Sequence, residues 1–216
     1  MYSIVKNKWF YSTEKFLLYI DIIDKCNYNC AYCSTKNYRK NKNNYLNLNK
    51  LTTFIKNTKH LQNKKIIIQL LGGEPTLHPD LKKFIKENPN YIINIYTNFS
   101  ESINYYNDLL NFKNFELTIS YHFNNTNNTV YNFFNKYIKL HNFKNIFNIV
   151  LFEHKYINQN INLFKLFLDF YQKNNISMHN LDISLIDNSN SYNELYTLEE
   201  KQYYDYLYNY VKNKHD

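Results

Sequence analysis

The sequence predicts an α/β fold class, a partial (β/α)6 barrel with parallel strands. Two observations predict it. Apolar runs of strand length alternate with longer segments whose apolar residues recur at helical spacing, a pattern typical of βα units with right-handed crossovers. A cysteine motif and a glycine motif each follow an apolar run at its carboxyl end, where the catalytic groups of such barrels gather. The two observations are independent, and they agree.

The elements are expected in strict alternation. The strands are expected at residues 16–23, 65–71, 91–98, 115–122, 146–153 and 179–186. The helices are expected near 48–58, 79–88, 101–112, 127–141, 158–173 and 197–213. Pro79 fits the first turn of the second helix, and Pro89 marks its end. We expect a single domain over 1–216, with the barrel at roughly 16–186 and a C-terminal helix at 197–213.

The cysteines of the chain stand in one short motif directly after the first apolar run. Cys26, Cys30 and Cys33 have the spacing C-x3-C-x2-C and are the only cysteines among 216 residues. A closed zinc site is disfavoured, because no fourth cysteine exists and no histidine lies between residues 34 and 59. Three thiolates suit a [4Fe–4S] cluster with one iron left open.

The second motif is Gly72-Gly73-Glu74-Pro75, after the apolar run 65–71. Gly72 and Gly73 are the only glycines of the chain. Glycine is needed where the backbone takes a positive φ or approaches a ligand closely. An ordinary strand-to-helix turn would explain two glycines alone. Their position before a carboxylate, downstream of the three thiols, favours a binding site.

Together these motifs resemble the radical S-adenosylmethionine (radical SAM) superfamily. The resemblance rests on Cys26, Cys30 and Cys33, on the aromatic Tyr32 before the last cysteine, and on Gly72-Gly73-Glu74-Pro75. It implies that the cysteines bind three irons of a [4Fe–4S] cluster and that S-adenosyl-L-methionine chelates the fourth. Gly72, Gly73 and Glu74 would contact the amino group of that cofactor, and Tyr32 would lie near its adenine. The implied activity is reductive cleavage to a 5′-deoxyadenosyl radical, which abstracts hydrogen from a substrate.

Strand alternation nominates further site residues. In the run 117–122 one face is apolar and the other is polar, and the polar face is expected to point into the barrel. The polar face consists of Thr118, Ser120 and His122. By its position Ser120 resembles the ribose-contacting residue of the family. His122 is a candidate catalytic residue that binds substrate or donates a proton, and the alternative is a rim histidine without a catalytic role.

The third strand ends in Thr97-Asn98-Phe99. Many members of the family have Thr-Asn-Gly here, so the resemblance implies that Thr97 and Asn98 bind the cofactor. Phe99 departs from that pattern. At the fifth strand this chain has no glycine for an adenine-binding turn, and Glu153 and Leu185 are weaker candidates.

Charge and composition bound the partners. The net charge is +8 with a pI near 9.1, but Lys and Asn are spread along the whole chain, as a compositional bias would spread them. Nucleic-acid binding has only this charge in its favour and no recognised module. The basic segment 36–45 could steer an acidic electron donor of the flavodoxin or ferredoxin type, or contact a polymer substrate, or be a solvated loop. With no signal peptide and no membrane-spanning run, we expect a cytoplasmic protein.

Two classes of function remain. The first is a radical SAM enzyme acting on a peptide or protein, with a nucleotide-derived small molecule as the alternative substrate. The second is a non-catalytic iron–sulfur redox or iron sensor. The glycine motif discriminates between them, because a sensor has no need to chelate an amino acid. A second cluster within this sequence is excluded, since no cysteines remain to bind it.

Overall fold

The computed structural model describes residues 15–30, 33, 44–58, 64–122, 129–140, 144–152, 157–177 and 180–185, with isolated helical residues between 198 and 209. Strands and helices alternate along the chain. The strands are β1 (Lys15–Ile23), β2 (Lys65–Gly72), β3 (Ile92–Thr97), β4 (Phe115–Tyr121), β5 (Ile146–Phe152) and β6 (Leu181–Leu185). The helices are α1 (Leu48–Asn57), the short 3-10 helix η2 (Pro75–Leu77), α2 (Leu81–Glu87), α3 (Ile103–Leu110), α4 (Val130–Tyr137) and α5 (Ile157–Lys173).

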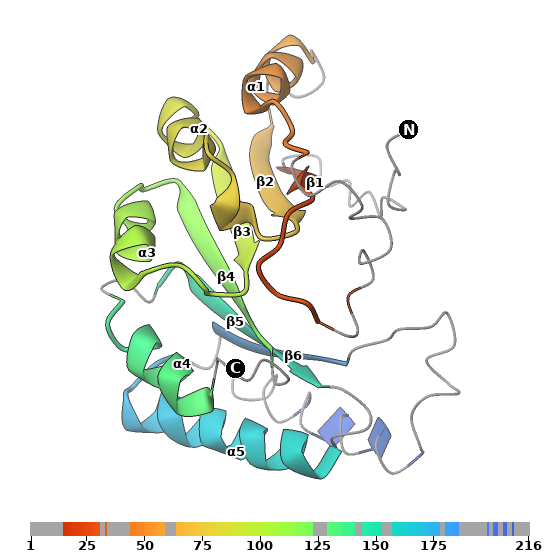
Figure 1. The fold of residues 1–216 in the computed structure, drawn as a ribbon, viewed down its shortest axis with the longest axis vertical. Helices are drawn as coiled ribbons and strands as arrows, with labels where there is room; N and C mark the ends of the chain where they lie inside the picture. Colours follow the sequence, from red (N-terminus) through yellow and green to blue (C-terminus); the bar gives the residue numbers. More distant parts are fainter. Residues whose placement is uncertain are drawn as a thin grey trace.

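The six strands form one parallel sheet in the order β1-β2-β3-β4-β5-β6. β1 and β6 lie at its two edges, so the sheet is curved but not closed (Figure 1). Helices α1 to α5 follow the strands in turn and cover one side of the sheet (Figure 1). The predicted partial (β/α)6 barrel is confirmed. All carboxyl ends of the strands therefore meet at one rim.

Side-chain caps explain where several helices begin. Asn47, Ser102 and Thr129 each accept a hydrogen bond from the backbone N–H three residues later, at the starts of α1, α3 and α4. α2 differs from the expectation for Pro79. That proline lies in the turn before the helix, and Asp80 occupies the N-cap position without a side-chain capping hydrogen bond. The ring of a proline is compatible with either place, because neither requires its missing N–H.

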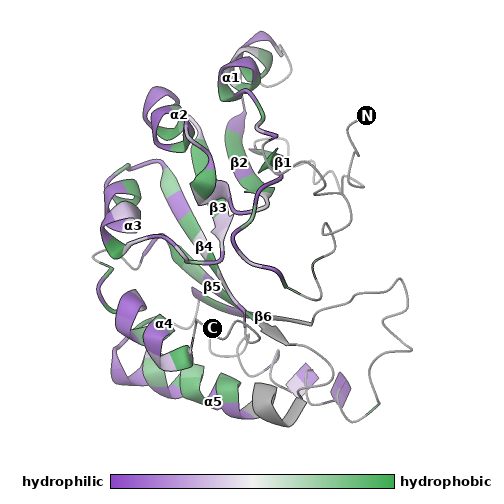
Figure 2. Ribbon diagram, in the orientation of Figure 1, coloured by the Kyte–Doolittle hydropathy of each residue, from purple (hydrophilic) through white to green (hydrophobic). Residues whose placement is uncertain are grey.

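The apolar face of the sheet packs under the helices, as strand alternation predicts. Leu117, Ile119 and Tyr121 of β4 are all buried. The Tyr121 ring meets Phe133 of α4 edge-to-face at 5.1 Å and Phe167 of α5 at 5.4 Å between ring centroids. Figure 2 shows the same division, with apolar colour concentrated on the strands and polar colour on the outer sides of the helices.

The opposite face of the sheet is largely polar. Thr118 donates a hydrogen bond to Asn94 at 3.0 Å, and Asn94 in turn donates to Glu116 at 3.5 Å. On the same face Tyr19 is 49% exposed and Phe147 is 36% exposed, although both belong to strands. This inner face thus combines hydrogen-bonding groups with accessible aromatic rings below the rim.

Of the expected C-terminal helix 197–213, only isolated residues are described, and these are helical. Within the part of the chain that the structure describes, no helix is long and apolar enough to cross a bilayer.

Candidate functional site

The glycine motif is joined to the start of the cysteine motif by backbone hydrogen bonds. β1 and β2 are paired as far as Ile23 and Gly72. Beyond that pair, the Gly73 N–H donates to the Ile23 carbonyl at 2.6 Å and the Glu74 N–H donates to the Lys25 carbonyl at 2.8 Å. The chain after β1 is therefore held against the chain after β2 up to the residue before Cys26.

Both glycines are required by this close approach. Gly72 has φ of +123°, a backbone conformation that residues other than glycine rarely adopt. A Cβ on Gly72 would stand 2.4 Å from the Ile23 carbonyl oxygen, and a Cβ on Gly73 would stand 1.9 Å from that of Lys25. The expected positive φ is confirmed at Gly72, whereas the expected close approach was that of a ligand. The group that approaches here is the backbone of the protein itself.

Glu74 is buried at the rim, with 1% of its surface exposed. Its Oε1 accepts from the Thr76 N–H at 3.2 Å, the Thr76 hydroxyl at 2.6 Å and the Thr97 hydroxyl at 2.6 Å. Its Oε2 accepts from the Asn98 N–H at 2.8 Å. Burial raises the pKa of this carboxyl, and the hydrogen bonds act in the opposite direction. Glu74 therefore braces the end of β2 against the end of β3.

Asn98 extends this network to the cysteine motif. Its side-chain amide donates to Asn27 Oδ1 at 2.8 Å and lies 3.9 Å from Cys26 Sγ. Asn27 in turn donates to the Ser100 hydroxyl at 2.7 Å. The Tyr28 N–H lies 3.4 Å from Cys26 Sγ. Asn98 thus links the end of β3 to the residues around the first cysteine.

The turn after β3 keeps a left-handed backbone without glycine. Phe99 has φ of 60°, and its ring is buried against Tyr106 at 4.7 Å and Phe133 at 5.6 Å. The Lys136 ammonium of α4 lies 4.3 Å from the centre of the Phe99 ring and donates to the carbonyls of Phe99 and Glu101. Burial lowers the pKa of Lys136 to about 8. Phe99 thus takes the place of the glycine in the family pattern, and the packing of its buried ring stabilises the left-handed backbone.

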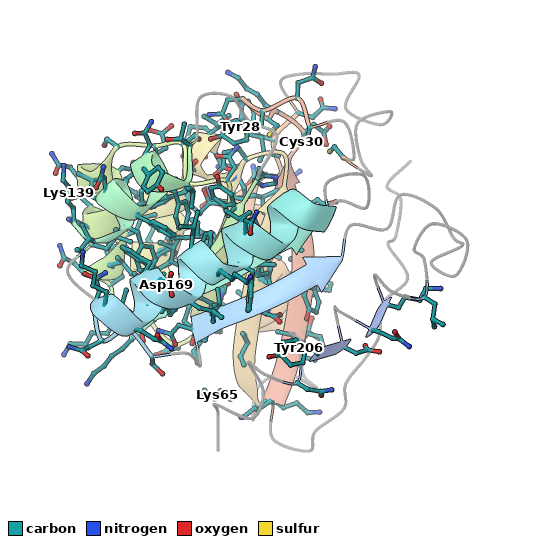
Figure 3. The ribbon with its side chains drawn as sticks, turned by 90° about the horizontal axis from the view of Figure 1, so that it is seen from below. Tyr28, Cys30, Lys65, Lys139, Asp169 and Tyr206 are labelled. Carbon is teal, nitrogen blue, oxygen red and sulfur yellow. The ribbon has the colours of Figure 1, made fainter. Side chains whose placement is uncertain are left out.

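His122 follows β4 at the same rim. Its Nδ1 lies 3.6 Å from Cys30 Sγ, and its ring meets that of Tyr28 edge-to-face at 5.9 Å. Burial lowers the pKa of His122 to about 4, so the imidazole is neutral at neutral pH. The pKa of Tyr28 is raised, by burial first and then by the charges of Glu74, Cys30 and Cys26. Figure 3 shows Tyr28 and Cys30 together at this end of the molecule.

The three cysteines suit an iron–sulfur cluster. Cys26, Cys30 and Cys33 are half-buried thiols without a disulfide, and the Cys33 N–H donates to the Cys30 carbonyl at 3.3 Å. Among the described residues, no group of three Cys, His, Asp or Glu side chains converges on one point as ligands of a single metal ion would. A [4Fe–4S] cluster takes one thiolate at each of several iron corners. Three accessible thiols in one loop suit that geometry.

The remaining expected site residues are placed as follows. Ser120 is half-buried on the same face of β4 as His122. Thr97 is buried, and its hydroxyl contacts Glu74 and the Tyr106 hydroxyl rather than the inner face. Tyr32, Glu153 and most of segment 36–45 lie outside the described residues, and so does the Leu185 side chain.

Sequence reasoning missed several residues of this network, and four of them show why. They are Asn27, Thr76, Tyr106 and Lys136. Thr76 donates to the Glu74 carboxylate, which caps the 3-10 helix, and the sequence carried little signal of this because glutamate is not a preferred capping residue. Tyr106 and Lys136 carried no signal, because the chain contains many tyrosines and lysines and only the fold brings these two to the rim.

A family model described as the Radical SAM superfamily matches residues 20–165. A GTP 3′,8-cyclase of Pasteurella multocida (strain Pm70) is 33% identical over 79 residues, which are 34% of this chain and 23% of the cyclase. A crystal structure of Streptococcus suis SuiB bound to precursor peptide SuiA has a TM-score of 0.61 at 17% identity, covering 94% of this chain and 47% of that one. Native anSMEcpe with bound AdoMet has a TM-score of 0.60 at 16% identity, covering 91% and 62%. The chain spans only part of each of these proteins.

Proposed function

Because the chain belongs to the radical SAM superfamily, an enzyme class, we propose that it cleaves S-adenosylmethionine reductively to abstract hydrogen from a substrate. The observation that carries the proposal is the junction of the glycine motif with the cysteine motif through the Gly73–Ile23 and Glu74–Lys25 hydrogen bonds. When bound, a [4Fe–4S] cluster with one open iron supplies the electron that cleaves the sulfonium and yields a 5′-deoxyadenosyl radical. The protein supplies position and exclusion of water.

Each of the residues at the rim has a part in that proposal. Cys26, Cys30 and Cys33 hold the cluster as thiolates. Glu74 and Asn98 fix the relative position of the β2 and β3 ends, so that a cofactor bound between them meets a preformed surface. Ser120, which is half-buried on the inner face of β4, is proposed to contact the ribose. We also propose that Tyr32 lies near the adenine and that Thr97 contributes to cofactor binding.

The proposed contact of Glu74 with the amino group of the cofactor is constrained by the hydrogen bonds that its carboxylate already accepts. Both carboxylate oxygens already accept hydrogen bonds from Thr76, Thr97 and Asn98. The amino group of a bound cofactor would meet a carboxylate whose orientation these hydrogen bonds already fix. We therefore assign to Glu74 mainly the positioning of the Gly72–Glu74 backbone.

Two substrate classes have support. A peptide or protein is favoured by the open sheet and its accessible inner face with Tyr19 and Phe147, and by the structural likeness to an enzyme solved with a precursor peptide. A nucleotide-derived small molecule is favoured by the 79 residues shared with a GTP 3′,8-cyclase. An acidic flavodoxin or ferredoxin would supply the electron. The basic composition of the chain suits such a donor.

The test is anaerobic reconstitution with iron and sulfide, followed by dithionite and S-adenosylmethionine. We expect 5′-deoxyadenosine and methionine in equal amounts, and neither from the Cys30→Ala variant. Thr53→Ala, on the exposed face of α1, is the control and should match the wild type. A reconstituted, reducible cluster that leaves the sulfonium intact would favour the sensor alternative. Purified protein that holds zinc instead would rule out both.

A further inference from the structure

We propose that His122 is a positioning residue for the cluster, donating a hydrogen bond from Nδ1–H to the Cys30 thiolate and thereby raising the reduction potential of the cluster. This inference rests on the proposed function, because it requires the cluster to be bound by Cys30. It differs from the substrate-binding or proton-donating role expected from the sequence, since the group that His122 faces belongs to the protein.

The geometry carries the inference. Nδ1 of His122 lies 3.6 Å from Cys30 Sγ, within reach of a hydrogen bond to sulfur. The two residues are 92 positions apart, so only the sheet brings them together. His122 directly follows β4, whose pairing with β3 and β5 fixes its backbone. The ring of Tyr28, from the cysteine motif itself, packs edge-to-face on the imidazole and limits its rotation.

The chemistry of the ligand sets the direction of the hydrogen bond. A cysteine that binds iron is a thiolate, which has no proton to give. The imidazole must therefore be the donor, and a neutral ring then carries its proton on Nδ1. The unmetallated protein allows either direction. Binding of the cluster would thus select one tautomer of His122.

A donor at this sulfur changes the redox property of the centre. Hydrogen bonds to the sulfurs of iron–sulfur clusters are among the factors that set their potential. Reduction adds negative charge, so a donor stabilises the reduced form more than the oxidised one and raises the potential. The same contact orients the ligand, as outer hydrogen bonds do at other metal sites.

Cys26 also has hydrogen-bond donors close to its sulfur. Its sulfur is approached by the Tyr28 N–H at 3.4 Å and, at 3.9 Å, by the Asn98 amide. A backbone donor cannot be removed by substitution. Of the two side-chain donors, the His122 imidazole lies nearer to its sulfur, at 3.6 Å, than the Asn98 amide does, at 3.9 Å, so its removal gives the sharper test of one donor.

The experiment compares His122→Asn, His122→Gln and His122→Leu with the wild type after anaerobic reconstitution. The side-chain nitrogen of asparagine can occupy the place of Nδ1, whereas that of glutamine reaches the place of Nε2. Iron and sulfide content are measured first. The midpoint potential then follows from a redox titration monitored by electron paramagnetic resonance. Thr118→Val is the control on the same face of β4, since Thr118 bonds to Asn94 and not to the cysteine motif.

We expect the wild type, His122→Asn and Thr118→Val to share one potential, and the Gln and Leu variants to shift to more negative values at full cluster content. Cluster loss in the Gln and Leu variants, with retention in the Asn variant, would equally support donation from Nδ1. Equal potentials in all five proteins would overturn the inference while leaving the proposed function intact. So would a shift or cluster loss in His122→Asn as large as that in His122→Leu. A wild type that assembles no cluster would refute the proposed function, and this inference with it.

Discussion

Gly73 faces the carbonyl group of Lys25 without room for a side chain, since a Cβ on Gly73 would stand 1.9 Å from that oxygen. The contact joins the two motifs on which the site depends. The backbone hydrogen bond from Glu74 N–H to the same carbonyl holds them together. The glycine motif is thus a structural requirement of the cysteine motif, before any cofactor binds.

Gly73→Ala should therefore disturb the cysteine motif as well as the turn. The methyl group would force the two backbones apart and break the Glu74–Lys25 hydrogen bond, and we expect a loss of about 2 kcal/mol in the free energy of unfolding. Iron incorporation on reconstitution should fall with it. Urea unfolding and iron analysis measure the two effects, with Thr53→Ala as the control. Wild-type values for both would contradict the steric argument.

Backbone strain at Phe99 can be tested by comparing the stability of the glycine and alanine variants, because strain would reverse their usual order. Phe99→Ala removes the buried ring, at a cost of about 3–5 kcal/mol, but keeps a side chain at φ of 60°. Phe99→Gly makes the same cavity and relieves the backbone strain, a gain of roughly 1–2 kcal/mol. We expect the glycine variant to be at least as stable as the alanine variant.

The matched control is Phe115, which is buried in β4 without a positive φ. There the glycine variant should be less stable than the alanine variant by about 1 kcal/mol. Denaturant unfolding of the four variants measures both differences. The same order at the two positions would show that the conformation at Phe99 carries no strain.

Phe99 also shows how far the sequence could predict the site. Apolar periodicity located every strand of the sheet to within about two residues, because buried parallel strands are continuously apolar. The motifs identified Cys26 and Glu74. They could not show that the Glu74 carboxylate faces Thr76 and Thr97, because those contacts depend on side-chain direction at the rim. The sequence also could not show that Phe99 adopts a left-handed backbone, because the packing of its ring outweighs the preference for glycine at that position.

The role of Glu74 as a brace predicts effects at a distance from the carboxylate. Thr76→Val removes one hydroxyl donor to Oε1 and retains the backbone donor. If the brace positions the cofactor-binding backbone, this variant should weaken S-adenosylmethionine binding in the same direction as Glu74→Gln, though less. Thr76→Val loses one hydrogen bond and should cost about 0.5–1.5 kcal/mol of stability, and Glu74→Gln, which places an amide group among donors, should cost about 1–3 kcal/mol.

Equilibrium binding to the reconstituted, unreduced protein measures the affinity, and iron content confirms that the cluster is intact. Lys83→Ala is a suitable control, because that side chain is exposed on α2 and its only described ion pair, with Glu87, is 4.0 Å long. Weakened binding in Glu74→Gln with wild-type binding in Thr76→Val would indicate direct contact between the carboxylate and the cofactor instead.

Lys136 predicts a pH dependence of stability. Its ammonium is held over the Phe99 ring and against the carbonyls of Phe99 and Glu101, and burial lowers its pKa from 10.5 to about 8. Between these two values the unfolded chain binds the proton and the folded chain does not. The free energy of unfolding attributable to Lys136 therefore rises with pH from about 8 to 10.5 and is lost as the pH falls back through 8. Lys136→Met lacks this titration. We expect the free energy of unfolding of the wild type minus that of Lys136→Met to increase across this pH window, as measured by anaerobic urea titrations. A difference that stayed constant or decreased would show that the ammonium is not desolvated by the turn after β3.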